Sequence, residues 1–210
     1  MRTNFTALAI TLSFYVALPS HAWGPKTQES IVRTSALFFS QDAKTPLRNL
    51  LSYVLEGSLV SPKKLGAVCP DFQTNPVAAI KREIHLLQAV RAERIDPYYV
   101  YRLGVLGQLV ADTTAPMGTL NPLYRGQYFA DVDASVGRAQ LTAQPRRIVD
   151  PHAYFGRLRG QIRDQENTII REYQAGQGFA GLASAALSSD VSRSVNAVLD
   201  VWNTVLTRDV

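Results

Sequence analysis

The stretch YRLGVLGQLVADTTAPMG, residues 101–118, predicts a long helix that is apolar on nearly every side. Gln108 and Asp112 interrupt this pattern four residues apart, so their side chains point the same way along the helix. Gly104 and Ala115 extend that face and are expected to leave room around the polar groups. A carboxylate that faces a helical core needs a cation or several hydrogen-bond donors. Two interpretations follow: Asp112 binds a metal ion, or it accepts hydrogen bonds from the backbone of the next loop.

The rest of the chain is also dominated by helical patterns. Four helix starts combine a capping side chain with a proline in the first turn, at Thr45-Pro46, Asn75-Pro76, Asp96-Pro97 and Asp150-Pro151. Residues 117–150 lack a regular pattern and are expected to be irregular, and no alternating strand-like segment occurs. The sequence predicts an all-α bundle of six or seven helices. The apolar pattern and the helix starts together predict helices at residues 29–40, 47–55, 76–95, 97–116 and 191–206, and the Asp150-Pro151 start predicts a polar helix at residues 151–173.

The first 22 residues have the layout of a secretory signal peptide: a positive charge, a short apolar run and a small-x-small motif. Cleavage is expected after Ala22, which leaves a single domain over residues 23–210 that begins with Trp23. The apolar run is too short for a membrane anchor, and no later segment of the sequence is apolar for long enough to cross a membrane. The sequence therefore predicts an exported protein, periplasmic or extracellular.

The composition narrows the class of partner only slightly. Loss of the leader removes one arginine and no acidic residue, so the formal charge of +5 falls to about +4. A mildly basic exported protein suits anionic phospholipid surfaces, whereas no lysine or arginine cluster indicates nucleic acid. The single cysteine, Cys69, excludes an internal disulfide.

Several polar features occur in an order that resembles the zinc-dependent phospholipase C family and the fungal single-strand nucleases that share its all-helical fold. The mature chain starts with Trp23, Asp71 follows a proline, and His85 lies fourteen residues later. Asp112 then precedes Pro116-Met117 in the register of the family's metal-binding helix. The resemblance covers roughly residues 23–133 and implies a zinc-binding phosphodiesterase fold.

Other positions depart from the family pattern. Glutamine or glycine replaces a family histidine at Gln28, Gln108 and Gly118, and the family's His-(x)₃-Glu pair falls on Arg125 and Phe129. The mature chain holds only His85 and His152, too few for a three-zinc cluster.

The resemblance therefore implies a reduced site made of Asp71, His85 and Asp112, with Gln108 as a weak oxygen ligand and the Trp23 amine nearby. Such a set is compatible with a single zinc, manganese or calcium ion.

Three functions remain open. The first is an exported protein on a phospholipase C-like scaffold, whose family reaction is hydrolysis of a phospholipid or another phosphodiester, with catalysis weak or absent. The second is a non-enzymatic binding or structural protein of the envelope or extracellular space that keeps only the fold, with Arg125 neutralising an aspartate that has lost its metal. The third is an unrelated helical exported protein whose spacings match by accident.

Overall fold

The computed structural model describes residues 22–42, 47–90, 95–117 and 122–207, and all regular structure in these ranges is helical. The predicted all-α class is therefore confirmed. The α-helices are α1 (Pro25–Asp42), α2 (Leu51–Ser58), α3 (Pro62–Val68), α4 (Pro76–Ala89), α5 (Pro97–Thr114), α6 (Pro122–Ser135), α7 (Pro151–Gln174), α8 (Leu182–Ala185) and α9 (Leu187–Leu206). Short 3-10 turns occur at η1 (Leu47–Leu50), η2 (Val136–Arg138) and η3 (Gly178–Ala180).

Three of these helices begin where the capping pattern predicts. The side chains of Asn75, Asp96 and Asp150 each accept a hydrogen bond from the backbone N–H three residues later, at 3.2, 2.7 and 2.9 Å respectively. A proline occupies the first turn of each helix, where its missing N–H costs nothing. The start predicted at Thr45-Pro46 lies outside the described residues.

The stretch predicted to be irregular, residues 117–150, contains helix α6. Tyr128, Phe129 and Val132 are buried and recur at helical spacing, although Gly126 and the neighbouring polar residues weaken the pattern. The acidic tract ADVDASV, residues 130–136, is mostly the last part of this helix. Among the described residues of this stretch, the prediction of irregular structure is correct for Met117 and for the segment that follows η2.

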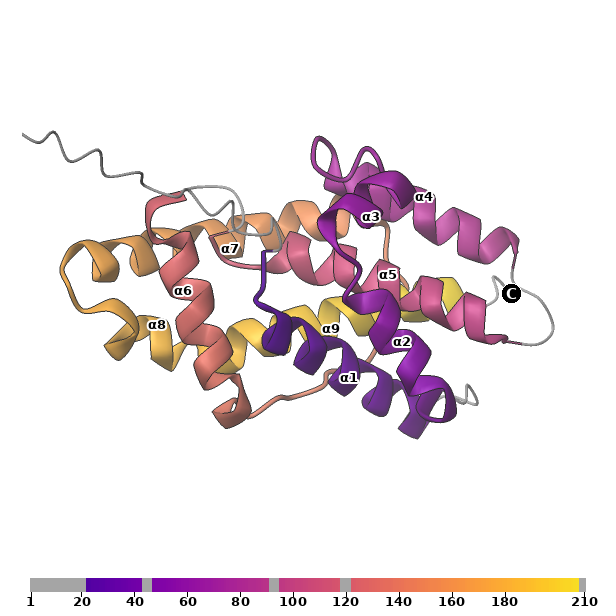
Figure 1. The fold of residues 1–210 in the computed structure, drawn as a ribbon, viewed down its shortest axis with the longest axis horizontal. Coiled ribbons are helices and arrows are strands. Elements are labelled where there is room, and N and C mark those ends of the chain that lie inside the picture. The colour runs from indigo at the N-terminus through magenta and orange to yellow at the C-terminus, as the bar shows by residue number, and fades with distance from the viewer. Residues whose placement is uncertain (1–21, 43–46, 91–94, 118–121, 208–210) are drawn as a thin grey trace, which may run out of the picture.

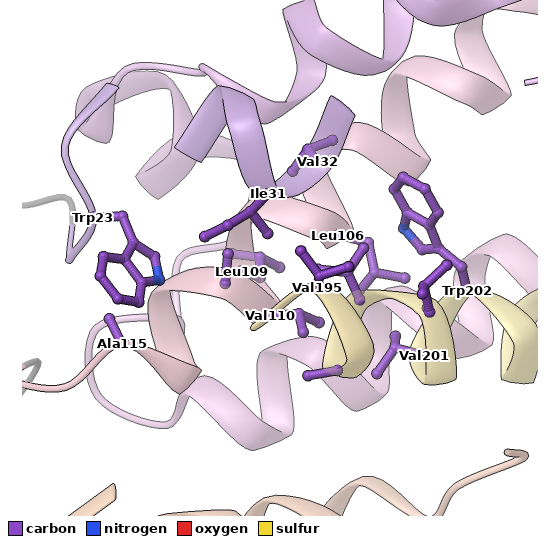
Figure 2. Close-up of a cluster of buried hydrophobic side chains, with 14 of the residues drawn as sticks. Trp23, Ile31, Val32, Leu106, Leu109, Val110, Ala115, Val195, Val201 and Trp202 are labelled. Carbon is purple, nitrogen blue, oxygen red and sulfur yellow. The ribbon is translucent and has the colours of Figure 1, made fainter. Parts of the chain in front are cut away.

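Helices α5 and α9 form the centre of the molecule and run in opposite directions (Figure 1). Helices α1 and α2 cover one side of this pair, α7 lies on the other, and α6 crosses one end. Figure 2 shows the core between α1, α5 and α9, with Trp202 at one end and Trp23 beside Ala115 at the other. The Trp202 indole N–H donates to the Leu103 carbonyl at 3.0 Å, so a buried polar group of the core is satisfied.

Helices α2 and α5 pack with their backbones in direct contact. A β-carbon added to Gly104 would overlap the carbonyl oxygen of Val54, and one added to Gly57 would overlap that of Tyr101. Glycine at these two positions allows the helices to approach closely. Gly104 therefore accommodates α2 and leaves no open space beside Gln108, whereas Ala115 and Asp112 both line a cavity at the end of α5.

Residues 139–149, named here the strap, run extended along α9. Five of their backbone N–H groups donate to α9 side chains that are spaced four residues apart along one stripe of the helix. The pairs are Gln140 with Ser188 (3.0 Å), Thr142 with Ser192 (3.1 Å), Gln144 with Asn196 (2.7 Å), Arg147 with Asp200 (2.8 Å) and Val149 with Thr204 (2.9 Å). This stripe supplies the partners that an extended segment otherwise obtains from a β-sheet.

Two charged pairs are buried within the bundle. Arg102 of α5 donates two hydrogen bonds to Glu83 of α4, at 2.8 and 2.6 Å, and the Glu83 side chain is only 2% exposed. In α9, Arg193 donates to Asp190 at 3.1 Å, and Tyr128 donates to the other oxygen of Asp190 at 3.5 Å. Burial raises the pKa of Asp190 from its ordinary value of 3.8 to about 6, although its hydrogen-bond partners oppose this shift.

Candidate functional site

Gln108 is fully buried and connects α5 to the segment after α2. Its side-chain amide donates to the Val60 carbonyl at 3.0 Å. This carbonyl belongs to a buried residue between two helices, where an unpaired acceptor would be costly. Gln108 thus satisfies the backbone of the α2–α3 connection.

Asp112 lies one turn further along α5 and is only 9% exposed. Its Oδ1 accepts a hydrogen bond at 3.2 Å from the backbone N–H of Ala22, which is itself 5% exposed. A backbone N–H therefore donates to this carboxylate, as one of the two interpretations of the sequence expects. The donor does not belong to the next loop, however, because Ala22 precedes Asp112 by 90 residues. Asp112 holds the segment in front of α1 against the end of α5.

The opening Trp23-Gly24-Pro25 is also fixed by contacts with α6. Trp23 is 1% exposed, and its ring packs edge-on against Phe129 with centroids 5.8 Å apart. The Asp133 carboxylate caps α1 by accepting the backbone N–H groups of Lys26 and Thr27, and a β-carbon at Gly24 would overlap this carboxylate. Phe129 and Asp133 therefore anchor the N-terminal segment.

Asp71 and His85 do not join Asp112. Asp71 lies on an exposed turn and forms an ion pair with Arg82. His85 is exposed because α4 turns Ile80, Ile84 and Leu87 towards the core, and it lines a shallow hollow that also contains His152. In the part of the chain that the structure describes, no three His, Cys, Asp or Glu side chains are grouped closely enough to hold a metal ion. The structure therefore does not bring Asp71, His85 and Asp112 together at one site, contrary to the expectation from the resemblance.

The positions where the chain departs from the family pattern differ in their environment. Gln28 is 2% exposed in α1, and its side-chain amide has no hydrogen-bond partner among the described residues. Arg125 is half-buried, with its guanidinium 5.8 Å from the centre of the Phe129 ring. Gly118 lies outside the described residues.

A cavity of about 690 Å³ adjoins Asp112 and is named here the α7 pocket. It lies between α3, the turn that follows α3, the end of α5, α6 and α7, and Ala22 forms part of its wall. Its apolar lining includes Leu65, Phe72, Phe155, Leu158 and Ile162. Its charged lining consists of Asp112, Arg125, Arg159, Arg163 and Glu166.

The arginines of α7 give the pocket its electrostatic character. Arg159 and Arg163 are four residues apart, so they project from the same side of α7, and both are exposed. Neither takes part in an ion pair with any of the described residues. Together with Arg125 they place three guanidinium groups beside two carboxylates, so the pocket wall carries excess positive charge.

Cys69 also lines the α7 pocket. It is 2% exposed, and burial raises the pKa of its thiol above 9.0, with the nearby Glu83 carboxylate acting in the same direction. The neutral thiol is a poor nucleophile. Cys69 therefore serves as an apolar wall group.

The sequence-based site omitted the α7 residues. Phe155, Leu158 and Ile162 recur at helical spacing, and Arg159 and Arg163 directly follow Leu158 and Ile162. This pattern indicates a helix whose apolar face borders a basic edge. The opposite wall of the cavity comes from distant segments, so the sequence holds no local signal for the pocket itself.

Comparison with known proteins identifies no relative: no family, no curated protein and no solved structure matches the chain. Among the described helices, none combines the length and apolar character that a membrane span requires.

Proposed function

We propose that this chain is an exported, non-enzymatic binding protein that holds an anionic amphiphile, of the phospholipid or phosphodiester class, in the α7 pocket. The observation that carries the proposal is the combination of an apolar lining with Arg159 and Arg163 at its edge, which form no ion pair with any residue that the structure describes. Guanidinium groups bind phosphate oxygens in pairs of hydrogen bonds, and an apolar wall favours an acyl or aromatic portion of the same molecule.

The size of the cavity supports this class of ligand. Its volume of about 690 Å³ lies within the range of about 300–1,000 Å³ that is typical of small-molecule sites. Such sites are mostly apolar, with a few polar groups that orient the ligand, and the α7 pocket has this composition. We infer that the ligand's phosphate contacts the arginines while its apolar part contacts Phe72, Phe155 and Ile162.

The competing function is hydrolysis of a phosphodiester by a metal centre, as the resemblance to zinc-dependent phospholipase C implies. The residues present do not fit such a centre. Asp71 is paired with Arg82, His85 lies on an exposed helix face, and the Gln108 amide is bound to Val60. Of the ligands that the resemblance implies, only Asp112 lines the pocket, and one carboxylate does not supply the three protein ligands of a catalytic zinc site.

A binding experiment tests the proposal with a soluble short-chain phosphatidic acid as the probe. We expect measurable binding by titration calorimetry. The double variant Arg159→Gln, Arg163→Gln should lose affinity by about a hundredfold, because each of the two charge-assisted contacts contributes about 1.5 kcal/mol. Arg157→Gln is the matched control, since Arg157 is an exposed arginine of α7 that does not line the pocket.

Two further probes separate the alternatives. Inorganic phosphate alone should bind far more weakly than the lipid, because it gains nothing from the apolar wall. An activated phosphodiester incubated with zinc should show no turnover above that of the Asp112→Asn variant. Absence of lipid binding, an equal loss in Arg157→Gln, or turnover that depends on Asp112 would each overturn the proposed function.

A further inference from the structure

We propose that removal of the leader places the new α-ammonium group of the chain against Asp112, where the two form an ion pair that builds one wall of the α7 pocket. This inference rests on the cleavage that is part of the proposed export. Its basis is the contact between the Ala22 N–H and Asp112 Oδ1 at 3.2 Å, in which both residues are more than nine-tenths buried and both line the pocket.

The residues after the cleavage point are held independently of the leader. Trp23 is buried against Phe129, and Asp133 caps the first turn of α1. Gly24 is in such close contact with the Asp133 carboxylate that no side chain fits between them. Loss of the preceding residues therefore leaves the segment that carries the new terminus in place.

Chain geometry brings the terminus within reach of Asp112. Successive backbone nitrogens lie about 3–4 Å apart. In a chain that begins at Trp23, the charged nitrogen would therefore lie about this far from the position of the Ala22 nitrogen, which now contacts Oδ1. Removal of Ala22 also takes away the N–H that occupies this oxygen. A terminus at Ala22 would place the ammonium directly at the observed contact.

The chemistry favours this exchange of partners. In the uncleaved chain the Asp112 carboxylate is met here by a neutral amide, whereas a charge-assisted hydrogen bond from an ammonium is shorter and roughly twice as strong. The new positive charge would also lie on the wall that Arg125 shares. Cleavage would thus fix the N-terminal segment and add to the cationic character of the pocket.

The experiment compares a chain that begins at Trp23 with one that begins at Ser20, both prepared with native ends and studied in chelator. Only the shorter chain can place its ammonium at Asp112, whereas the longer chain retains the Ala22 amide contact. We expect the melting temperature of the Trp23 chain to be higher by about 3–6 °C. In the Asp112→Asn background this difference should disappear.

A labelling experiment gives a second measurement that does not depend on the folding of the variant. The α-amino group of the Trp23 chain should react with an amine-reactive reagent at least about tenfold more slowly than that of the Ser20 chain, because the paired, buried ammonium is protected. Equal melting temperatures in the two chains, a difference that persists in Asp112→Asn, or equal labelling rates would each overturn the inference. None of these readouts involves the lipid, so a failure of the proposed function would leave them unchanged.

Discussion

The close contact between α2 and α5 predicts that Gly104→Ala destabilises the protein. The added methyl group would overlap the Val54 carbonyl oxygen, which belongs to the backbone and cannot rotate away as a side chain can. The two helices would have to separate, and Gln108, one turn further along the same face, would be drawn away from the Val60 carbonyl that it binds. The substitution should therefore loosen this whole edge of α5.

The expected magnitude follows from two opposing terms. Overpacking of a dense core costs about 1–3 kcal/mol and sometimes more. The better helix propensity of alanine offsets this by about 1 kcal/mol. Because the obstructing atom is a backbone oxygen, the upper part of the overpacking range applies, and we expect a net loss of about 2 kcal/mol. For a chain of this length such a loss lowers the melting temperature by about 4–8 °C.

Thermal and urea denaturation measure this effect, with Gly160→Ala as the matched control. Gly160 lies in the interior of α7, and a β-carbon there meets nothing within 4 Å. This variant should gain up to about 1 kcal/mol from helix propensity alone. If Gly104→Ala is as stable as the native protein, or if both variants shift in the same direction, the backbone contact between α2 and α5 does not have the geometry described.

Three other predictions concern stability. Because the folded-state pKa of Asp190 is about 6 against an ordinary 3.8, the folded protein binds the extra proton between these values, so its stability should fall by about 2 kcal/mol as the pH rises from 4 to 6. Asp190→Asn should lack this component in urea titrations across that range, and parallel pH profiles would contradict the assignment. Glu83→Ala leaves the partly buried Arg102 without its carboxylate partner and should cost about 3 kcal/mol, whereas Glu29→Ala, in an exposed pair, should cost less than about 0.5 kcal/mol. Comparable losses of the two variants in chemical denaturation would refute the distinction. Asn196→Ala should speed hydrogen exchange of the Gln144 amide at least about fivefold, since it removes the acceptor, and unchanged exchange would show that the contact does not protect this amide.

Much of the fold follows from local signals in the sequence. The Asp96-Pro97 start and the apolar run of α5 predict a buried helix, and the structure contains one. Helix α6 is the main omission, because Gly126 and several polar residues obscure the spacing of its buried aromatic side chains. Local propensity identifies strongly periodic helices and misses those whose stability comes from tertiary packing.

The site was predictable only in part, because its contacts join distant segments. The pairing of Asp112 with a backbone N–H matches one of the two initial interpretations, but the identity of Ala22 as the partner depends on the path of the whole chain. For His85 the necessary signal was present locally: the apolar stripe of Ile80, Ile84 and Leu87 already directs this residue away from the core. The apolar stripe of each helix, which shows the face that is turned to the core, is therefore a better guide to which polar residues meet than their order along the chain.

The strap offers a practical consequence for redesign. Helix α9 binds this segment through backbone N–H groups, while Leu141 and Val149 pack with the core and the Arg146 guanidinium lies over the Phe39 ring. A foreign peptide of equal length that keeps these three side chains, such as an epitope or a protease-cleavage sequence, should be accepted there if no proline replaces a donating residue. The native segment already obeys this restriction, since its own proline, Pro145, occupies a position whose nitrogen is not used.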